Sequence, residues 1–204
     1  AINGGIPVRP TPLPYGRQSI DDEDVNAVVE VLRSDWLTTG PKVKEFENEA
    51  ARYFGVKHAV TVNSWTSGLV AAVGAIGIEP GDEVILMAPS WPTHVEQVEL
   101  IGATPVLVKC ERPSFHPNLD DVAAAITDRT SAILINSPNN PTGAVYTPEE
   151  MQGLVRLAIE HDLWIISDEI YAELIWNECE HVAPAAIEGQ IDVVKINPGA
   201  KLRM

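Results

Sequence analysis

The spacing of hydrophobic residues changes along the chain, and these changes predict where helices and strands lie. From Asp21 onward, apolar residues recur at helical spacing behind an acidic start, which predicts a helix that ends near Asp35. A turn at residues 39–41 leads to a second amphipathic stretch, residues 43–54, which Gly55 closes. The first 19 residues hold four prolines and three glycines, so we expect residues 1–20 to form an extended arm.

Beyond Gly55, short apolar runs alternate with longer helix-like stretches. The runs contain β-branched residues and predict strands at residues 58–62, 83–87, 104–108, 132–136, 163–167 and 192–196. The intervening stretches predict helices at residues 67–76, 93–101, 119–126 and 148–161. This alternation predicts an α/β three-layer sandwich whose mainly parallel sheet is covered by helices on both faces.

Size and charge narrow the function classes. A chain of 204 residues with 45% hydrophobic content can form one substantial α/β domain, which we expect over residues 21–204. The net charge of -15 argues against nucleic acid or an anionic membrane as a partner, because the required surplus of Lys and Arg is absent. No membrane-spanning apolar run or signal peptide is recognised, and Cys110 and Cys179 have neither metal-site nor disulfide spacing. We therefore expect a cytoplasmic protein.

Polar residues directly after the predicted strands are the first candidates for a site, because ligands of open α/β sheets bind beyond the carboxyl ends of the strands. Residues 63–68 place Ser and Thr before an apolar helix, where a phosphate could bind, although simple helix capping explains the same pattern. Trp91 follows the next run and could stack on a planar ring or pack as an ordinary aromatic. No role is assigned to His94.

Two further strand ends carry unusual polar residues. Residues 137–143 read Ser-Pro-Asn-Asn-Pro-Thr-Gly, an order more particular than a turn alone requires. Asp168 ends an apolar run, where an acid is costly to bury unless a cation meets it; capping of a helix is the simpler alternative. A nucleotide-binding domain is disfavoured, since neither a Gly-x-Gly-x-x-Gly nor a Walker loop follows any run.

These segments carry a resemblance to enzymes that use pyridoxal 5'-phosphate (PLP). APSWPTHVEQVEL (88–100), INSPNNPTGAVYTPEE (135–150) and WIISDEIYAEL (164–174) resemble class I/II aminotransferases of the aspartate aminotransferase family. Residues 16–55, followed by TVNSWTSGL (61–69), resemble the DegT/DnrJ/EryC1/StrS sugar-nucleotide aminotransferases. Both families share the fold-type I scaffold, and the mixture implies a divergent, chimeric or designed member.

The resemblance implies roles for matching residues. Asp168 matches the carboxylate that pairs with the pyridinium nitrogen of PLP, which keeps the ring an electron sink. Tyr171 and Asn140 match the pair that hydrogen-bonds the cofactor's phenolic oxygen. Trp91 matches the aromatic residue on the ring face. The phosphate loop of both families is matched by Trp65, Thr66 and Ser67.

Lys201 is the best match to the Schiff-base lysine of the family, and Lys195 is the second candidate. The alternative is that Lys201 is only a lysine near the chain end, with no such role. Past this point the resemblance implies a small domain and a substrate-binding arginine. We expect that the small domain is largely missing and that Arg203 does not serve as that arginine. We expect a PLP-dependent aminotransferase, a homodimer, that moves an amino group from an amino acid to a keto acid or keto sugar. The alternative is a truncated or designed PLP-fold fragment that binds the cofactor weakly or not at all and lacks catalysis.

Overall fold

The structure is a computed structural model that describes residues 9, 11, 19–176, 179–187 and 193–196. Contacts divide the chain into two compact units, Ala1–Val60 and Thr61–Met204. Most of the expected arm at residues 1–20 lies outside the described residues, so that expectation stays a prediction.

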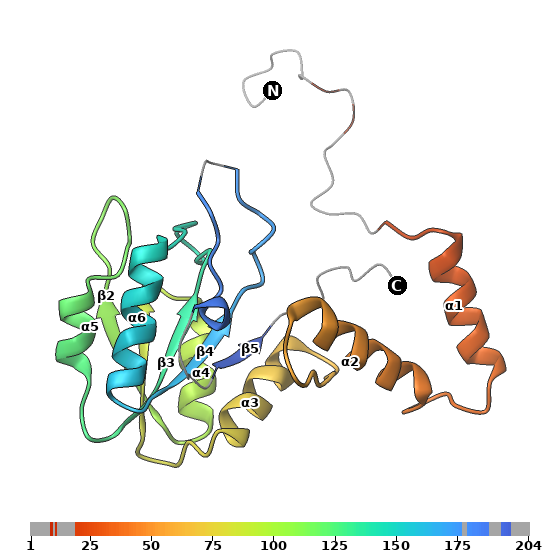
Figure 1. Cartoon of the computed structure of the whole chain (residues 1–204), viewed down its shortest axis with the longest axis horizontal. Helices are drawn as coiled ribbons and strands as arrows, with labels where there is room; N and C mark the ends of the chain where they lie inside the picture. Colours follow the sequence, from red (N-terminus) through yellow and green to blue (C-terminus); the bar gives the residue numbers. More distant parts are fainter. Residues whose placement is uncertain (1–8, 10, 12–18, 177–178, 188–192, 197–204) are drawn as a thin grey trace. The chain divides into compact units, whose positions relative to one another are not determined.

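The first unit contains the two helices that the sequence predicts (Figure 1). Helix α1, Asp22–Arg33, begins at a capping box in which Asp21 and Asp24 satisfy each other's backbone N–H groups. Helix α2, Pro41–Phe54, starts with proline in its first turn and ends at Gly55, whose φ of 66° is the left-handed conformation that glycine adopts without strain. Both predictions are confirmed.

The second unit is an α/β fold. Its five described strands form one parallel sheet in the order β2-β1-β3-β4-β5. The strands are β1 Glu83–Ala88, β2 Thr104–Lys109, β3 Thr130–Asn136, β4 Trp164–Asp168 and β5 Val193–Ile196. The helices are α3 Trp65–Ala75, α4 Pro92–Leu100, α5 Leu119–Ala125, α6 Pro148–Glu160 and the short 3-10 helix η1 Pro184–Ala186. Five of the six predicted strands and all the predicted helices are present.

Alternation of side chains along the central strands builds a core on each face of the sheet. Ile133 of β3 and Ile165 of β4 face one core, which the apolar sides of α5 and α6 complete. Their neighbours Leu134 and Ile166 face the opposite core, together with residues of α3 and α4. Because successive side chains of a strand point to opposite faces, an apolar run can fill both cores at once. The expected three-layer sandwich is confirmed, and Figure 1 shows α5 and α6 on the same side of the sheet.

The strand predicted at residues 58–62 is not formed. The run has no strand conformation, and Val60 and Val62 are exposed. A strand needs a neighbour that accepts and donates its backbone hydrogen bonds. The prediction was wrong because β-branched composition is compatible with a strand but does not supply that neighbour.

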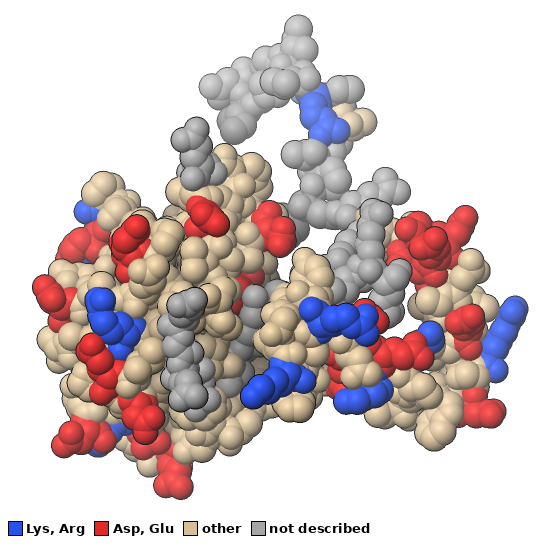
Figure 2. Space-filling view, in the orientation of Figure 1, with Lys and Arg blue, Asp and Glu red and all other residues tan. Residues whose placement is uncertain are grey.

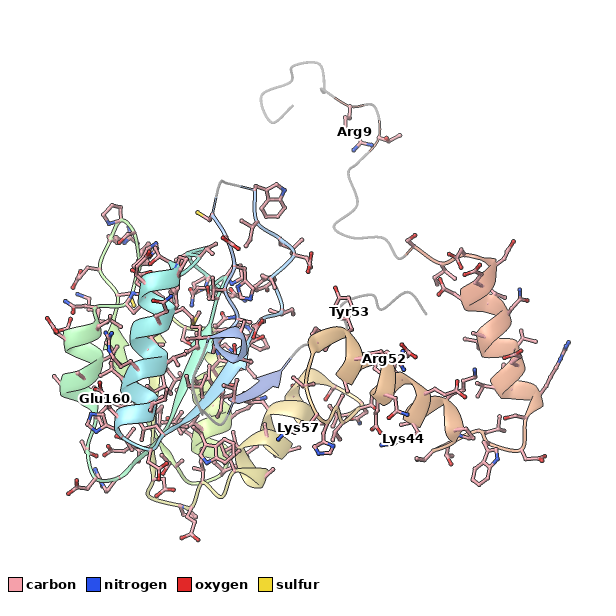
Figure 3. All side chains as sticks on the ribbon, viewed as in Figure 1. Arg9, Lys44, Arg52, Tyr53, Lys57 and Glu160 are labelled. Atoms are coloured by element: carbon pink, nitrogen blue, oxygen red, sulfur yellow. The ribbon has the colours of Figure 1, made fainter. Side chains whose placement is uncertain are left out.

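Charge is distributed unevenly between the units. Residues 61–204 hold 20 of the 29 acidic residues but only 7 of the 14 Lys and Arg residues. Figure 2 shows acidic side chains scattered over the α/β unit on the face in view, and Figure 3 shows Lys44 and Arg52 projecting from α2. The α/β unit therefore has the wrong charge to attract a polyanion. In the part of the chain that is described, no helix is long and apolar enough to cross a membrane.

Candidate functional site

The strand order places a ligand-binding crevice between β1 and β3. From β1 the chain passes through α4 to β2 at one edge of the sheet, and then returns past β1 to β3 on its other side. The loops after β1 and β3 therefore leave the sheet in opposite directions, which opens a crevice at the carboxyl ends of these strands. A pocket of about 190 Å³ lies among the residues that follow β1, β3 and β4. It is lined by Trp91, His94, Asn136, Asn140, Asp168, Ile170 and Tyr171.

A buried carboxylate–imidazole pair lines the pocket. Asp168, the last residue of β4, is 3% exposed, and His94 in the first turn of α4 is 1% exposed. An ionised carboxylate only accepts hydrogen bonds, so His94 Nε2–H donates to Asp168 Oδ2, at 3.0 Å. The second nitrogen, Nδ1, lies 3.2 Å from the hydroxyl of Ser90. His94 thus supplies a hydrogen-bond donor to the buried acid at this strand end.

Asn136 fixes the ends of β3 and β4 against each other. It pairs directly with Asp168 in the parallel register. Its side-chain Nδ2 donates to the backbone carbonyl of Asp168 at 3.2 Å, and its Oδ1 accepts from the backbone N–H of Asn140 at 2.8 Å. One buried amide therefore holds both the acid and the polar turn that follows β3.

Asn140 and Tyr171 form a second polar pair at the pocket. Asn140 Nδ2 lies 3.5 Å from Tyr171 Oη, at the outer limit of a hydrogen bond. Both side chains are half-buried and line the same pocket. An amide donor and a phenol donor this close together can bind one anionic oxygen between them.

Trp91 supplies the aromatic surface of the pocket. It is the N-cap residue of α4 and is half-buried. Its ring meets the imidazole of His94 edge-on, at 5.6 Å between centroids and 89° between planes. His94 therefore contacts both the indole of Trp91 and the carboxylate of Asp168.

The residues expected to form a phosphate loop lie at the start of α3. Ser64 is the N-cap, and its Oγ accepts from the backbone N–H of Ser67. Trp65, Thr66 and Ser67 form the first turn, where N–H groups have no partner within the helix. Thr66 and Ser67 are not among the described residues that line the pocket. Their proposed contact with a phosphate stays a prediction.

The candidate lysines are not placed. Lys201 lies outside the described residues. The backbone of Lys195 belongs to β5 and pairs in register with Ser167, but its side chain is not among those that the structure describes. Covalent attachment of a cofactor to either lysine stays a prediction.

Other reactive groups give no competing site. Burial, followed by the charge of Glu150, raises the pKa of the Cys110 thiol, so this cysteine is protonated and serves as a core residue. Cys179 is exposed and free. Within the described ranges, no group of three or more His, Cys, Asp or Glu residues could hold a metal ion.

The structure brings together four of the eight residues predicted for the site: Trp91, Asn140, Asp168 and Tyr171. The sequence interpretation left His94 without a role, and this was its main omission. The signal that could have found His94 was its place one turn into the helix after β1, at the same sheet edge as the unpaired acid.

Comparisons with known proteins agree with this geometry. The sequence profile of the DegT/DnrJ/EryC1/StrS aminotransferase family matches residues 18–172. An aspartate aminotransferase from Thermus thermophilus, solved with maleate, is 39% identical over 67% of this chain and 35% of its own, with a TM-score of 0.61. An aspartate aminotransferase from Thermotoga maritima is 31% identical over 85% of this chain and 49% of its own, with a TM-score of 0.73. An alanine aminotransferase from Pyrococcus furiosus is 30% identical over 85% of this chain and 46% of its own, with a TM-score of 0.71. The chain spans less than half the length of these solved structures.

Proposed function

Because the chain belongs to the DegT/DnrJ/EryC1/StrS aminotransferase family, we propose that its pocket binds PLP and supports transfer of an amino group from an amino acid to a keto acid or keto sugar. The observation that carries the proposal is the buried Asp168–His94 pair at the strand switch point, beside an indole and an amide–phenol pair. Bound PLP supplies an electron sink for the carbanion formed when an amino acid loses its α-proton.

The residues of the pocket fit the parts of this cofactor. The carboxylate of Asp168 would hold a proton on the ring nitrogen, since a negative partner favours the charged form. His94 keeps that carboxylate oriented through Oδ2, while the backbone N–H of Ile170 holds Oδ1 at 3.2 Å. A carboxylate has about four lone-pair positions, so each oxygen retains room for a further donor.

The remaining contacts follow from the same geometry. Asn140 Nδ2 and Tyr171 Oη would bind the phenolic oxygen, and the indole of Trp91 would lie against one face of the ring. The first turn of α3, residues 65–67, would bind the phosphate through backbone N–H groups. Lys201 would bind the cofactor aldehyde and afterwards accept the α-proton.

A direct test follows the cofactor and the keto product separately. The protein is titrated with PLP while absorbance is recorded, and L-aspartate, L-alanine or L-glutamate is then added without an acceptor. We expect saturable binding and formation of keto acid in proportion to bound PLP, measured with a coupled dehydrogenase.

The variant Asp168→Asn tests whether keto acid formation depends on the proposed site. It is expected to reduce the rate of keto acid formation. Saturable PLP binding without keto acid would leave only a cofactor-binding fragment, and absence of binding would refute the proposal.

A further inference from the structure

A second buried carboxylate follows the first on the opposite face of the sheet. Glu169 directly succeeds Asp168 and is 1% exposed. Its Oε1 accepts from Ser167 Oγ at 3.0 Å, and its Oε2 accepts from His181 Nε2–H at 2.9 Å. Because side chains alternate, Ser167 and Glu169 lie on the face covered by α6, whereas Asp168 lies on the face of α4. The end of β4 is therefore held from both sides.

The hydrogen bond to Glu169 is the polar contact that the described structure gives to the His181 side chain. Its side chain is 13% exposed, and it makes one hydrogen bond with the described residues, to Glu169. Its Nδ1 is buried and has no partner in that part of the chain. The segment that carries it packs into the core on the α6 face through Val182 and Ile187. A polar group buried at this expense is typical of a position that fixes a particular conformation.

The turn that Glu169 fixes is the one that presents the pocket residues. The backbone N–H of Ile170 donates to Asp168 Oδ1 at 3.2 Å, and the N–H of Ala172 donates to the carbonyl of Glu169 at 3.0 Å. Tyr171 lies between these two bonds and carries the phenol that meets Asn140. Anchoring the Glu169 side chain thus restricts the backbone on which both Asp168 and Tyr171 depend.

We propose that the Ser167–Glu169–His181 cluster positions the cofactor-binding turn from behind, with His181 and Glu169 acting as positioning residues for Asp168 and Tyr171. This inference rests on the proposed function for its consequence, but its geometry can be tested without cofactor. Loss of the His181 donor should loosen the turn while the strand beneath it stays intact.

The test combines amide hydrogen exchange with PLP titration of the same variants. His181→Leu removes the donor, and His181→Gln keeps an N–H at similar reach. His161→Leu removes an exposed imidazole at the end of α6 and is the matched control. In His181→Leu, exchange at Ile170 and Ala172 is expected to accelerate about tenfold, the lower end of what loss of a charge-assisted hydrogen bond produces. Exchange at Ile165 and Ile166 in β4 should stay unchanged.

The same variant should bind PLP about tenfold more weakly, and His181→Gln should restore both readouts to within about twofold of the unmodified chain. Unchanged exchange at Ile170 and Ala172, or equal acceleration throughout β4, would overturn the inference. If the unmodified chain binds no PLP, the proposed function fails, while the exchange comparison still decides the positioning role. If His181→Leu does not fold, Ser167→Ala must show the same local pattern, and its absence overturns the inference as well.

Discussion

At the scale of single residues, the account depends on a buried carboxylate and the imidazole that meets it. Asp168 and His94 are 74 residues apart in the chain and 3.0 Å apart in the structure. In the protein interior, removing one member of such a pair is destabilising, because the other member is left buried without its hydrogen-bond partner. The acid could be singled out from the sequence because it ends an apolar run. Its partner His94 could be listed as a candidate by its place after a predicted strand, but the contact itself could not be predicted, since the distance between two loops depends on the order of strands in the sheet.

His94→Leu is therefore expected to destabilise the fold by about 3 kcal/mol, because it leaves Asp168 Oδ2 buried without the donor from His94. Urea denaturation monitored by circular dichroism measures the change. In an Asp168→Asn background the same substitution should be much less harmful, because a neutral amide leaves no buried charge without a donor. Equal losses in both backgrounds would show that the two side chains are not coupled.

Asp168→Asn by itself separates function from stability. The amide keeps the size of the side chain but cannot hold a proton on the cofactor's ring nitrogen, so transamination should fall at least about 100-fold. The thermal midpoint should change far less than in His94→Leu. Unchanged transamination at equal thermal stability would contradict the role given to this carboxylate.

At the scale of elements, helix packing predicts different effects on stability when two helical glycines are replaced by alanine. In α6, a Cβ added at Gly153 would clash with Leu119 Cδ1, whereas at Gly74 in α3 it would meet nothing within 4 Å. Gly74→Ala should therefore stabilise the protein by about 0.5–1 kcal/mol through helix propensity. Gly153→Ala should lose that gain, because Leu119 must be displaced. Chemical denaturation of both variants measures the difference, and an equal gain at the two positions would refute this packing argument.

The start of β1 carries an acid whose titration should be visible in acid unfolding. Thr127 Oγ1 donates to Glu83 Oε2 at 2.5 Å, and Arg129 pairs with the same carboxylate. The Thr127 hydrogen bond and, after it, the charge of Arg129 outweigh burial and lower the pKa of Glu83. Folding then favours the ionised form, so this stabilisation is complete above the unfolded pKa of about 4.3 and is lost as the pH falls toward the folded pKa.

Glu83→Gln should consequently lower the melting temperature at pH 7 more than at pH 3, where the carboxyl group is already becoming protonated. Thermal unfolding at the two pH values measures this difference. A gap between the two proteins that stays constant with pH would contradict the assignment.

The elements themselves were largely predictable, for a reason visible in β3 and β4. Their apolar residues fill two cores by simple alternation, so a short apolar run between helical patterns identifies a strand without knowledge of its neighbours. Residues 58–62 show the limit of this reasoning. Their composition is equally favourable, yet Val60 is exposed and no strand forms. Pairing is a property of two segments and cannot be derived from one of them.

At the scale of the whole molecule, the pocket is smaller than a usual ligand site. Its volume of about 190 Å³ lies below the range of roughly 300–1,000 Å³ that is common for small-molecule sites. The described residues thus supply one wall of a site and no clamp for a substrate carboxylate. The polar residues at the predicted strand ends indicated this wall from the sequence, and the order of strands then located it.

We predict that the protein self-associates and that a second copy contributes to this incomplete site. Sedimentation velocity in the presence of PLP should show a dimer as the main species. A monomer across the micromolar range, with PLP bound, would contradict the prediction and would require the site to function within one chain.

The central claim is that the pocket beside Asp168 holds PLP within reach of Lys201. Reduction of the PLP-treated protein with borohydride, followed by peptide mass mapping, tests it most directly. We expect one pyridoxyl adduct on Lys201, which disappears in Lys201→Ala and is retained in the control Lys195→Ala. An adduct on Lys195 instead, labelling spread over exposed lysines, or no adduct at all would contradict it.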